Sequence, residues 1–140
     1  MADYHKAGLV ALRGERMLLC KKRDLNSKLI LPGGRFEEGE SAEQCLRREV
    51  REELGAVSLG PIEYIGTYKD RAASDDPTVV KTVEIELYRG ELIGEPVASM
   101  EIVELIWFGP NSDKDQLSPI LINHIVPDLL KRSLLPWKNN

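Results

Sequence analysis

Apolar and polar residues alternate with a period of two along several stretches of the chain, which is the pattern of β-strands that bury one face. The alternation is clearest in residues 79–88, where Val79, Val83, Ile85 and Leu87 fall on one side. From this pattern we predict strands over residues 7–12, 16–23, 28–31, 61–68, 79–88 and 102–108.

Turn-forming residues separate these stretches. The sequence Pro-Gly-Gly at 32–34 is expected to end the third strand, and Gly60-Pro61 to form a turn before the fourth. Residues 72–78 are polar, and residues 89–100 are rich in turn formers. We therefore predict loops in both of these segments.

The period changes to that of a helix in residues 42–54. Ser41 and Gln44 have the spacing of a capping box, in which each side chain bonds the backbone of the other residue. Gly55 is well placed to stop the helix in the left-handed conformation. This helix is the best-signalled element of the chain.

A second apolar-periodic segment closes the sequence. It starts at Ser118-Pro119, where we expect the serine to cap a helix, and Pro127 inside it predicts a kink or a break. Strands thus surround one helix, and another helix ends the chain. This order favours an α/β fold with a mixed sheet covered by helices on two sides.

Composition narrows the class of protein. The chain has 140 residues, of which 42% are hydrophobic and 30% charged, so we expect a single folded domain over residues 1–140. The formal net charge of −4 makes a long nucleic acid an unfavourable partner, because phosphate neutralisation dominates such binding.

The expected location is the cytoplasm. The N-terminal sequence lacks the layout of a signal peptide, and no apolar run approaches the ~20 residues of a membrane span. The two cysteines, Cys20 and Cys45, lie in apolar-periodic segments, where we expect reduced thiols that pack in the interior.

The predicted helix over 42–54 carries an acidic face. Glu49, Glu52 and Glu53 lie at positions i, i+3 and i+4, beside the apolar stripe, whereas Arg47 and Arg51 lie on the far side. Like charges at these spacings repel by about 0.2–0.5 kcal/mol per pair. A divalent cation would relieve this repulsion, because Mg²⁺ and Mn²⁺ prefer carboxylate oxygens. The helix alone leaves open a structural face held by salt bridges.

The residues around the helix add a motif. Residues 34–56, GRFEEGESAEQCLRREVREELGA, have the form Gly-x5-Glu-x7-Arg-Glu-apolar-x-Glu-Glu-x-Gly-apolar. This segment resembles the signature of the Nudix hydrolases, and all seven fixed positions match. The last position is Ala56, which is smaller than the Ile or Val often found there.

The resemblance implies an α/β/α sandwich with a loop-helix-loop motif, and hydrolysis of a nucleoside diphosphate linked to another group with Mg²⁺, for which Mn²⁺ can substitute. It implies that Glu52 and Glu53 are the core metal ligands and that Glu49 joins them directly or through water. The Gly34 carbonyl is a further candidate ligand. Arg48 resembles the arginine that orients a catalytic glutamate.

Carboxylates outside this helix are also candidates. Glu101 lies where similar MutT-type proteins have a metal-linked glutamate, so we predict that it is catalytic and binds metal, with Glu104 as its rival. Glu40 is expected to stabilise the loop. Among the nearby cations, Arg23 and Arg35 are our candidates for substrate phosphates, with a solvated charge run as the alternative.

Markers of the substrate are weaker. The chain lacks the residues downstream of the motif that mark the ADP-ribose and dinucleoside polyphosphate classes, which leaves (deoxy)nucleoside triphosphates as the leading substrates. ADP-ribose or nucleotide sugars come second, and a nucleotide sensor without catalysis is a third reading. The expected partner is a small nucleotide, with a homodimer possible from the resemblance.

Overall fold

The computed structural model describes residues 1–138, without the side chain of residue 26. The described chain forms, in order, β1 (Tyr4–Val10), β2 (Leu12–Arg13), β3 (Arg16–Lys22), β4 (Leu25–Ile30), β5 (Gly33–Arg35), α1 (Ala42–Leu54), β6 (Ser58–Arg71), β7 (Thr82–Ile93), β8 (Ile102–Phe108), a 3₁₀ turn η1 (Lys114–Gln116), a π-helical turn η2 (Leu121–Ile125) and α2 (Val126–Lys131).

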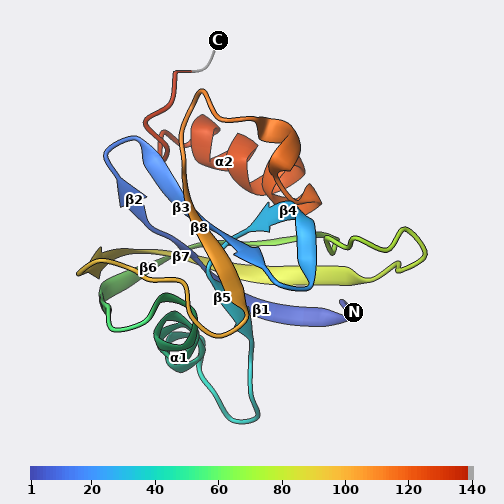
Figure 1. Cartoon of the computed structure of the whole chain (residues 1–140), viewed down its shortest axis with the longest axis horizontal. Helices are drawn as coiled ribbons and strands as arrows, with labels where there is room; N and C mark the ends of the chain where they lie inside the picture. Colours follow the sequence, from blue (N-terminus) through green and yellow to red (C-terminus); the bar gives the residue numbers. More distant parts are fainter. Residues whose placement is uncertain (139–140) are drawn as a thin grey trace.

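The strands form two sheets. The first has the order β5-β1-β7-β6, in which β1 runs parallel to β7 and antiparallel to β5. The second joins β2, β3 and β4, and β8 pairs with β3. Helix α1 lies on one side of the strands and α2 on the other, as Figure 1 shows. The predicted α/β architecture with helices on two sides is confirmed.

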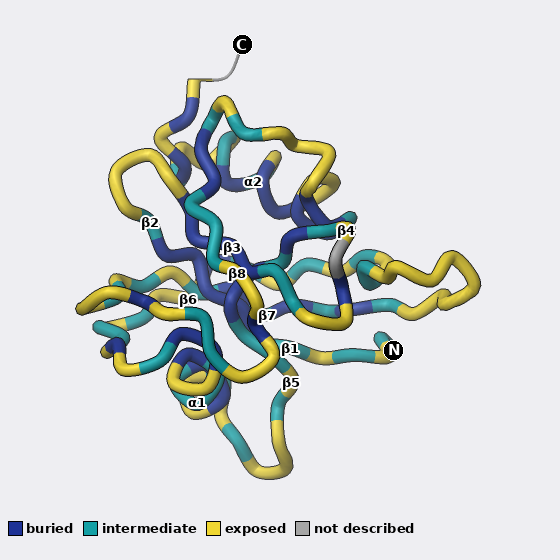
Figure 2. The backbone as a smooth tube through the Cα atoms, in the orientation of Figure 1, coloured by how far each residue is buried: buried dark blue, intermediate teal, exposed yellow. Residues whose placement is uncertain are grey.

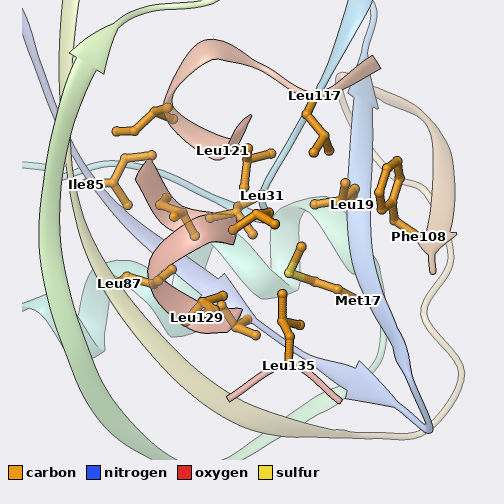
Figure 3. Close-up of a cluster of buried hydrophobic side chains, with 14 of the residues drawn as sticks. Met17, Leu19, Leu31, Ile85, Leu87, Phe108, Leu117, Leu121, Leu129 and Leu135 are labelled. Carbon is orange, nitrogen blue, oxygen red and sulfur yellow. The ribbon is translucent and has the colours of Figure 1, made fainter. Parts of the chain in front are cut away.

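Two apolar clusters hold these layers together. The first packs the C-terminal helical segment against both sheets, and Figure 3 shows Leu121 and Leu129 facing Ile85 and Met17 within it. The second packs Leu46 and its neighbours on α1 against the other side of the strands. In Figure 2 the buried segments follow the strands and the inner faces of both helices.

Helix α1 has the predicted bounds. Ser41 accepts from the Gln44 backbone and the Gln44 side chain accepts from the Ser41 backbone, so the capping box is confirmed. Gly55 has a φ of 77°, the positive value that glycine tolerates best, but its ψ of −141° lies outside the left-handed helical conformation. Helix α1 is therefore set at both ends by its own sequence.

Strand β7 differs from the prediction at both ends. It starts at Thr82 because Asp76 accepts hydrogen bonds from Thr78 and its carbonyl accepts from Val79, which closes a turn there. It continues to Ile93 through the predicted loop, since Gly90 lies where a side chain would crowd Leu59 and Ile62.

The turn expected at Gly60-Pro61 is wrong. Strand β6 runs through it from Ser58 to Arg71, with an irregularity in its pairing to β7 between Leu59 and Ile62. A bulge of this kind accommodates a proline, which lacks the N–H that the ladder requires. The pattern showed the proline but not its place inside a paired strand.

The Pro-Gly-Gly segment at 32–34, which was expected to end a strand, also contains the start of another, β5. Gly33 lies opposite Gly8 in the antiparallel pair with β1. A Cβ atom at Gly33 would lie 2.1 Å from the carbonyl oxygen of Ala7, and the glycine has a φ of 134°. Only glycine allows this approach, which brings the first residues of the motif onto the sheet.

The C-terminal helical segment widens instead of breaking. The Val126 N–H bonds the Leu121 carbonyl five residues earlier, and Pro127 stands in the first turn of α2. Since proline has no N–H to donate, a π-turn is a local solution. The side-chain cap expected from Ser118 is wrong, because its Oγ has no hydrogen-bond partner among the described residues.

Both cysteines are buried and free, as expected for packing thiols. None of the helices within residues 1–138 has the length and apolar character that crossing a bilayer requires.

Candidate metal and phosphate site

The acidic face of α1 spans a wide range of exposure. Glu53 is 2% exposed, whereas the side chains of Glu49 and Glu52 are 12% and 44% exposed. The predicted order, with Glu53 nearest the apolar stripe, is therefore confirmed by its burial. A solvated surface helix would not bury a carboxylate in this way.

Glu53 has one direct hydrogen bond of 2.8 Å, from the backbone N–H of Gly33 to its Oε1. Burial raises the pKa of Glu53 to about 8, against the effect of that bond and of Lys22 nearby, and the charges of Glu49 and Glu101 raise it further. The site thus holds a carboxyl group whose charge the protein alone compensates poorly.

Arg48 connects the helix to the preceding loop. Its Nε and Nη2 donate to the two oxygens of Glu40 at 2.7 and 2.9 Å, a two-pronged contact. Its Nη1 donates to Glu49 at 2.8 Å and to Glu52 at 3.3 Å, and its Nη2 also reaches the Arg35 carbonyl at 3.0 Å. This one guanidinium therefore fixes the position of Glu49, and Glu40 fixes the guanidinium.

Gly34 lies directly against Glu49. A Cβ atom built on Gly34 would lie 2.5 Å from the carboxyl carbon of Glu49 and 2.6 and 2.7 Å from its two oxygens. Any side chain at this position would therefore displace the carboxylate. The close approach explains in physical terms why the motif has glycine here.

Glu101 comes from a distant part of the sequence. It directly precedes β8, and its carboxylate lies 3.5 Å from the Lys22 Nζ, while its charge raises the pKa of Glu49 and Glu53. Its rival Glu104 lies opposite Lys21 in the register of β3 and β8 and does not line the cleft described below. The structure thus brings Glu101, and not Glu104, toward the acidic face of α1.

Gly34, Glu49 and Glu101 border a cleft of about 540 Å³. We call one part of its lining the acidic part, formed by Gly34, Arg35, Glu49, Glu101 and Lys22. The apolar part is formed by Ala72, Val83, Ile85, Ile120, Leu121 and Ser118. The cleft therefore offers charge to one part of a ligand and an apolar surface to another.

Four of the predicted site residues do not line this cleft: Arg23, Arg48, Glu52 and Glu53. Arg23 is exposed and bonds the Met100 carbonyl at 3.4 Å, while its backbone N–H bonds the Glu101 carbonyl at 2.9 Å. Glu52 is turned outward beside Arg48. A second cavity of about 470 Å³ is lined by none of the predicted site residues.

The family model described as NUDIX domain matches residues 3–121. The chain belongs to the NUDIX domain family. The match includes the whole motif, Glu101 and every residue that lines the cleft. The resemblance predicted from residues 34–56 is confirmed.

Other NUDIX proteins resemble the chain over shorter stretches. It is 42% identical over 65 residues to the NAD-capped RNA hydrolase NudC of Pseudomonas aeruginosa, a stretch that covers 42% of this chain and 21% of that protein. It is 36% identical over 74 residues to the 8-oxo-dGTP diphosphatase of Haemophilus influenzae, covering 53% and 50%. The chain thus spans between a fifth and a half of the length of these curated relatives.

Solved NUDIX structures share the fold. The NUDIX hydrolase of Nitrosomonas europaea superposes with a TM-score of 0.73 at 23% identity, covering 92% of this chain and 89% of that one. The MutT NUDIX hydrolase of Burkholderia pseudomallei gives 0.71 at 22% identity, covering 91% and 95%.

Hydrolases of this family generally need divalent metal ions, so the donor set matters. Residues 1–138 contain no group of three or more His, Cys, Asp or Glu side chains already gathered as a metal site. Arg48 donates hydrogen bonds to Glu49 and Glu52, whereas the backbone N–H of Gly33 donates to Glu53. The donor chemistry nevertheless fits a hard cation, because the donors are carboxylate oxygens and Glu53 is buried with little compensation.

The sequence prediction missed several cleft residues, including Lys6 and Ser118. Lys6, from β1, lies on the wall of the cleft, and Ser118 lies in the apolar part with its Oγ unpartnered. A signal for Lys6 existed, since a lysine there interrupts an otherwise apolar period of two in β1. No local signal marked Ser118, because a serine before a proline normally indicates a helix cap.

Proposed function

We propose that this chain is a metal-dependent pyrophosphohydrolase that cleaves a phosphoanhydride bond in a nucleoside diphosphate linked to another group. The observation that carries the proposal is the buried Glu53, which lies one helical turn from Glu49 on α1, while Glu49 lines the cleft together with the cations Lys22 and Arg35. Family membership supports the same chemistry.

The proposed metal ligands are the carboxylates of Glu49, Glu52, Glu53 and Glu101, with the carbonyl of Gly34. Their oxygen chemistry favours Mg²⁺, with Mn²⁺ as a substitute. When bound, the cation supplies neutralisation of phosphate oxygens and orientation of the phosphate chain. In this proposal Glu52 and Glu53 are the core ligands, and Glu49 joins them directly or through water.

The other residues hold this arrangement in place. Arg48 orients Glu49 through the 2.8 Å bond, and Gly33 orients Glu53 through its N–H. Arg35 lines the cleft and is the stronger candidate for a substrate phosphate. Arg23 bonds the Glu101 carbonyl through its backbone N–H and the Met100 carbonyl through its side chain. Because Arg23 lies outside the cleft lining, we assign it a phosphate contact only at the cleft entrance.

We propose (deoxy)nucleoside triphosphates as the leading substrates. The apolar part of the cleft suits an uncharged planar base, and the free Ser118 Oγ can donate or accept one hydrogen bond there. The 8-oxo-dGTP diphosphatase among the relatives supports this class. ADP-ribose and nucleotide sugars are the next class to test.

A second candidate is a nicotinamide dinucleotide. It is favoured by the 42% identity to NAD-capped RNA hydrolases over 65 residues. Such a substrate is also a nucleoside diphosphate linked to another group. The net charge of −4 makes the free dinucleotide a more favourable ligand than a long RNA chain.

The test is product release from a defined panel. The purified chain is incubated with the eight common nucleoside and deoxynucleoside triphosphates, 8-oxo-dGTP, ADP-ribose, NAD and diadenosine tetraphosphate, each with Mg²⁺, with Mn²⁺ and with EDTA. We expect metal-dependent turnover of a triphosphate to a monophosphate and pyrophosphate. Turnover that persists in EDTA would contradict the proposal, and so would a folded protein that binds nucleotides but hydrolyses none of them.

A further inference from the structure

Lys6 occupies a position where the fold otherwise has apolar side chains. In β1, Tyr4, Gly8 and Val10 share its side of the sheet, and Tyr4 and Val10 belong to the cluster under the C-terminal helical segment. Its partner on the neighbouring strand β7 is Ile85. The sheet pattern therefore calls for an apolar residue at this point, and the chain has a half-buried lysine.

The ammonium of Lys6 lacks a counter-charge at contact distance. Across residues 1–138 it makes no hydrogen bond and no ion pair, and its nearest aromatic contact is the Tyr4 ring, 5.9 Å from Nζ to the centroid. Burial is the main effect on Lys6 and lowers its pKa, Lys22 and Arg35 lower it further, and the charges of Glu53 and Glu49 oppose them. A charge in such a place destabilises the fold unless something binds it.

The strand order places Lys6 between the two parts of the cleft. Strand β1 lies between β5 and β7 in the first sheet. Lys6 is opposite Arg35 of the acidic part on one side and Ile85 of the apolar part on the other. The guanidinium carbon of Arg35 lies 4.7 Å from the centroid of the same Tyr4 ring, so two cations lie near one aromatic ring at the cleft.

We propose that Lys6 binds an anionic oxygen of the substrate phosphate attached to the nucleoside. A ligand with its phosphate chain in the acidic part and its base in the apolar part must place that phosphate next to β1. This inference rests on the proposed function for the identity of the ligand. It adds a binding residue outside the 34–56 motif, and it explains a cation that the fold does not need.

The experiment compares Lys6→Met with Lys21→Met. Methionine keeps the length and apolar stem of lysine, and Lys21 is a control from strand β3 that does not line the cleft. For the best substrate of the panel, Lys6→Met should raise the KM by about 10- to 100-fold with kcat within about threefold of wild type, since a charge-assisted hydrogen bond is lost. Lys21→Met should change the KM less than about twofold. An unchanged KM in Lys6→Met would overturn the proposal.

Binding without turnover separates this inference from the proposed function. Dissociation constants of GMP, AMP, guanosine and adenosine are measured by calorimetry for wild type and Lys6→Met. We expect weaker binding of the monophosphates and unchanged binding of the nucleosides. Equal weakening of nucleosides and monophosphates would mean that Lys6 contacts the base, which overturns the proposal even if the enzyme is active.

Thermal unfolding supplies the structural control. If Lys6 serves the ligand, Lys6→Met should have a Tm at least as high as that of wild type, because an unpaired charge is removed from an apolar sheet face. A Tm that falls clearly below those of wild type and Lys21→Met would show that Lys6 stabilises the fold, and would overturn the proposal.

Discussion

The backbone N–H of Gly33 donates a 2.8 Å hydrogen bond to the carboxylate of Glu53. The two residues lie on different elements, one at the start of the short strand β5 and the other in the last turn of α1. Since a Cβ at position 33 would collide with the Ala7 carbonyl, the same glycine sets both the strand pairing and the carboxylate. The sheet edge and the acidic helix face are thus positioned together.

The contact between Gly34 and Glu49 predicts the effect of one added methyl group. Gly34→Ala should displace the Glu49 carboxylate and lower kcat/KM on the order of a hundredfold, the scale of a misplacement of about 1 Å in a catalytic site. Steady-state kinetics checks this. Gly60→Ala is the matched control, because a Cβ there meets only the Glu91 carbonyl at 3.5 Å. Equal activity of both variants would contradict the account.

The geometry of Arg48 predicts that lysine cannot replace it. Lysine provides one ammonium, whereas the guanidinium bonds Glu40 through two nitrogens and Glu49 through a third. Arg48→Lys should therefore lower kcat by about 10-fold or more. Arg51→Lys, at an exposed position of the same helix, should lower it less than about threefold, as measured on the same substrate.

Glu40 predicts a dependence of stability on pH. Its hydrogen bonds with Arg48, and then that from the Glu37 backbone, lower the pKa of the carboxyl from 4.5 to about 2. A carboxyl with a lowered pKa in the folded state stabilises the fold above pH 4.5, and this contribution is lost as the pH falls toward about 2. Urea unfolding should therefore separate wild type from Glu40→Gln at neutral pH. The gap should narrow below about pH 3, and a constant gap would contradict the assignment.

Burial of Glu53 predicts that replacing it stabilises the metal-free protein but removes the response to Mg²⁺. In EDTA at about pH 9, Glu53→Gln should raise the free energy of unfolding by about 1–3 kcal/mol, because a buried carboxylate charge is removed while the Gly33 bond is kept. Mg²⁺ should then raise the Tm of wild type and leave that of Glu53→Gln nearly unchanged. Glu38→Gln, on the exposed loop, should behave like wild type in both conditions.

The position of Ser118 in the apolar part of the cleft predicts weaker substrate binding without a loss of stability. Ser118→Ala should raise the KM by about 2- to 10-fold through one lost hydrogen bond, without lowering the Tm, because its Oγ has no partner in the part of the chain that the structure describes. Ser58→Ala, exposed in β6, is the control. If Ser118→Ala leaves the KM of every panel substrate unchanged, the base does not contact this residue.

The local parts of the fold were predictable from the sequence. The capping box and the glycine after the helix define the two ends of α1, and each signal involves only neighbouring residues. The place of Glu53 beside the apolar stripe follows from helical periodicity alone. The motif of residues 34–56 added the family. These features need no information about distant contacts.

The remaining parts depend on contacts between distant residues. Strand β5 exists because Gly33 and Gly34 pair with β1, some 25 residues earlier in the chain. The local sequence around the two glycines does not reveal that pairing. The same holds for Lys6, which becomes a cleft residue only when β5 and β7 lie on both sides of β1. Glu101 was predictable from the family resemblance, and its nearness to Lys22 was not predictable from spacing.

The most direct test of the central claim is the kcat of the Glu52→Gln/Glu53→Gln double variant on the best panel substrate, over a titration of Mg²⁺. The account predicts a kcat lower than that of wild type on the order of a thousandfold at every Mg²⁺ concentration, with a folded protein by circular dichroism and with Glu38→Gln fully active. A folded double variant that keeps wild-type kcat and the same Mg²⁺ dependence would show that these glutamates do not form the metal site.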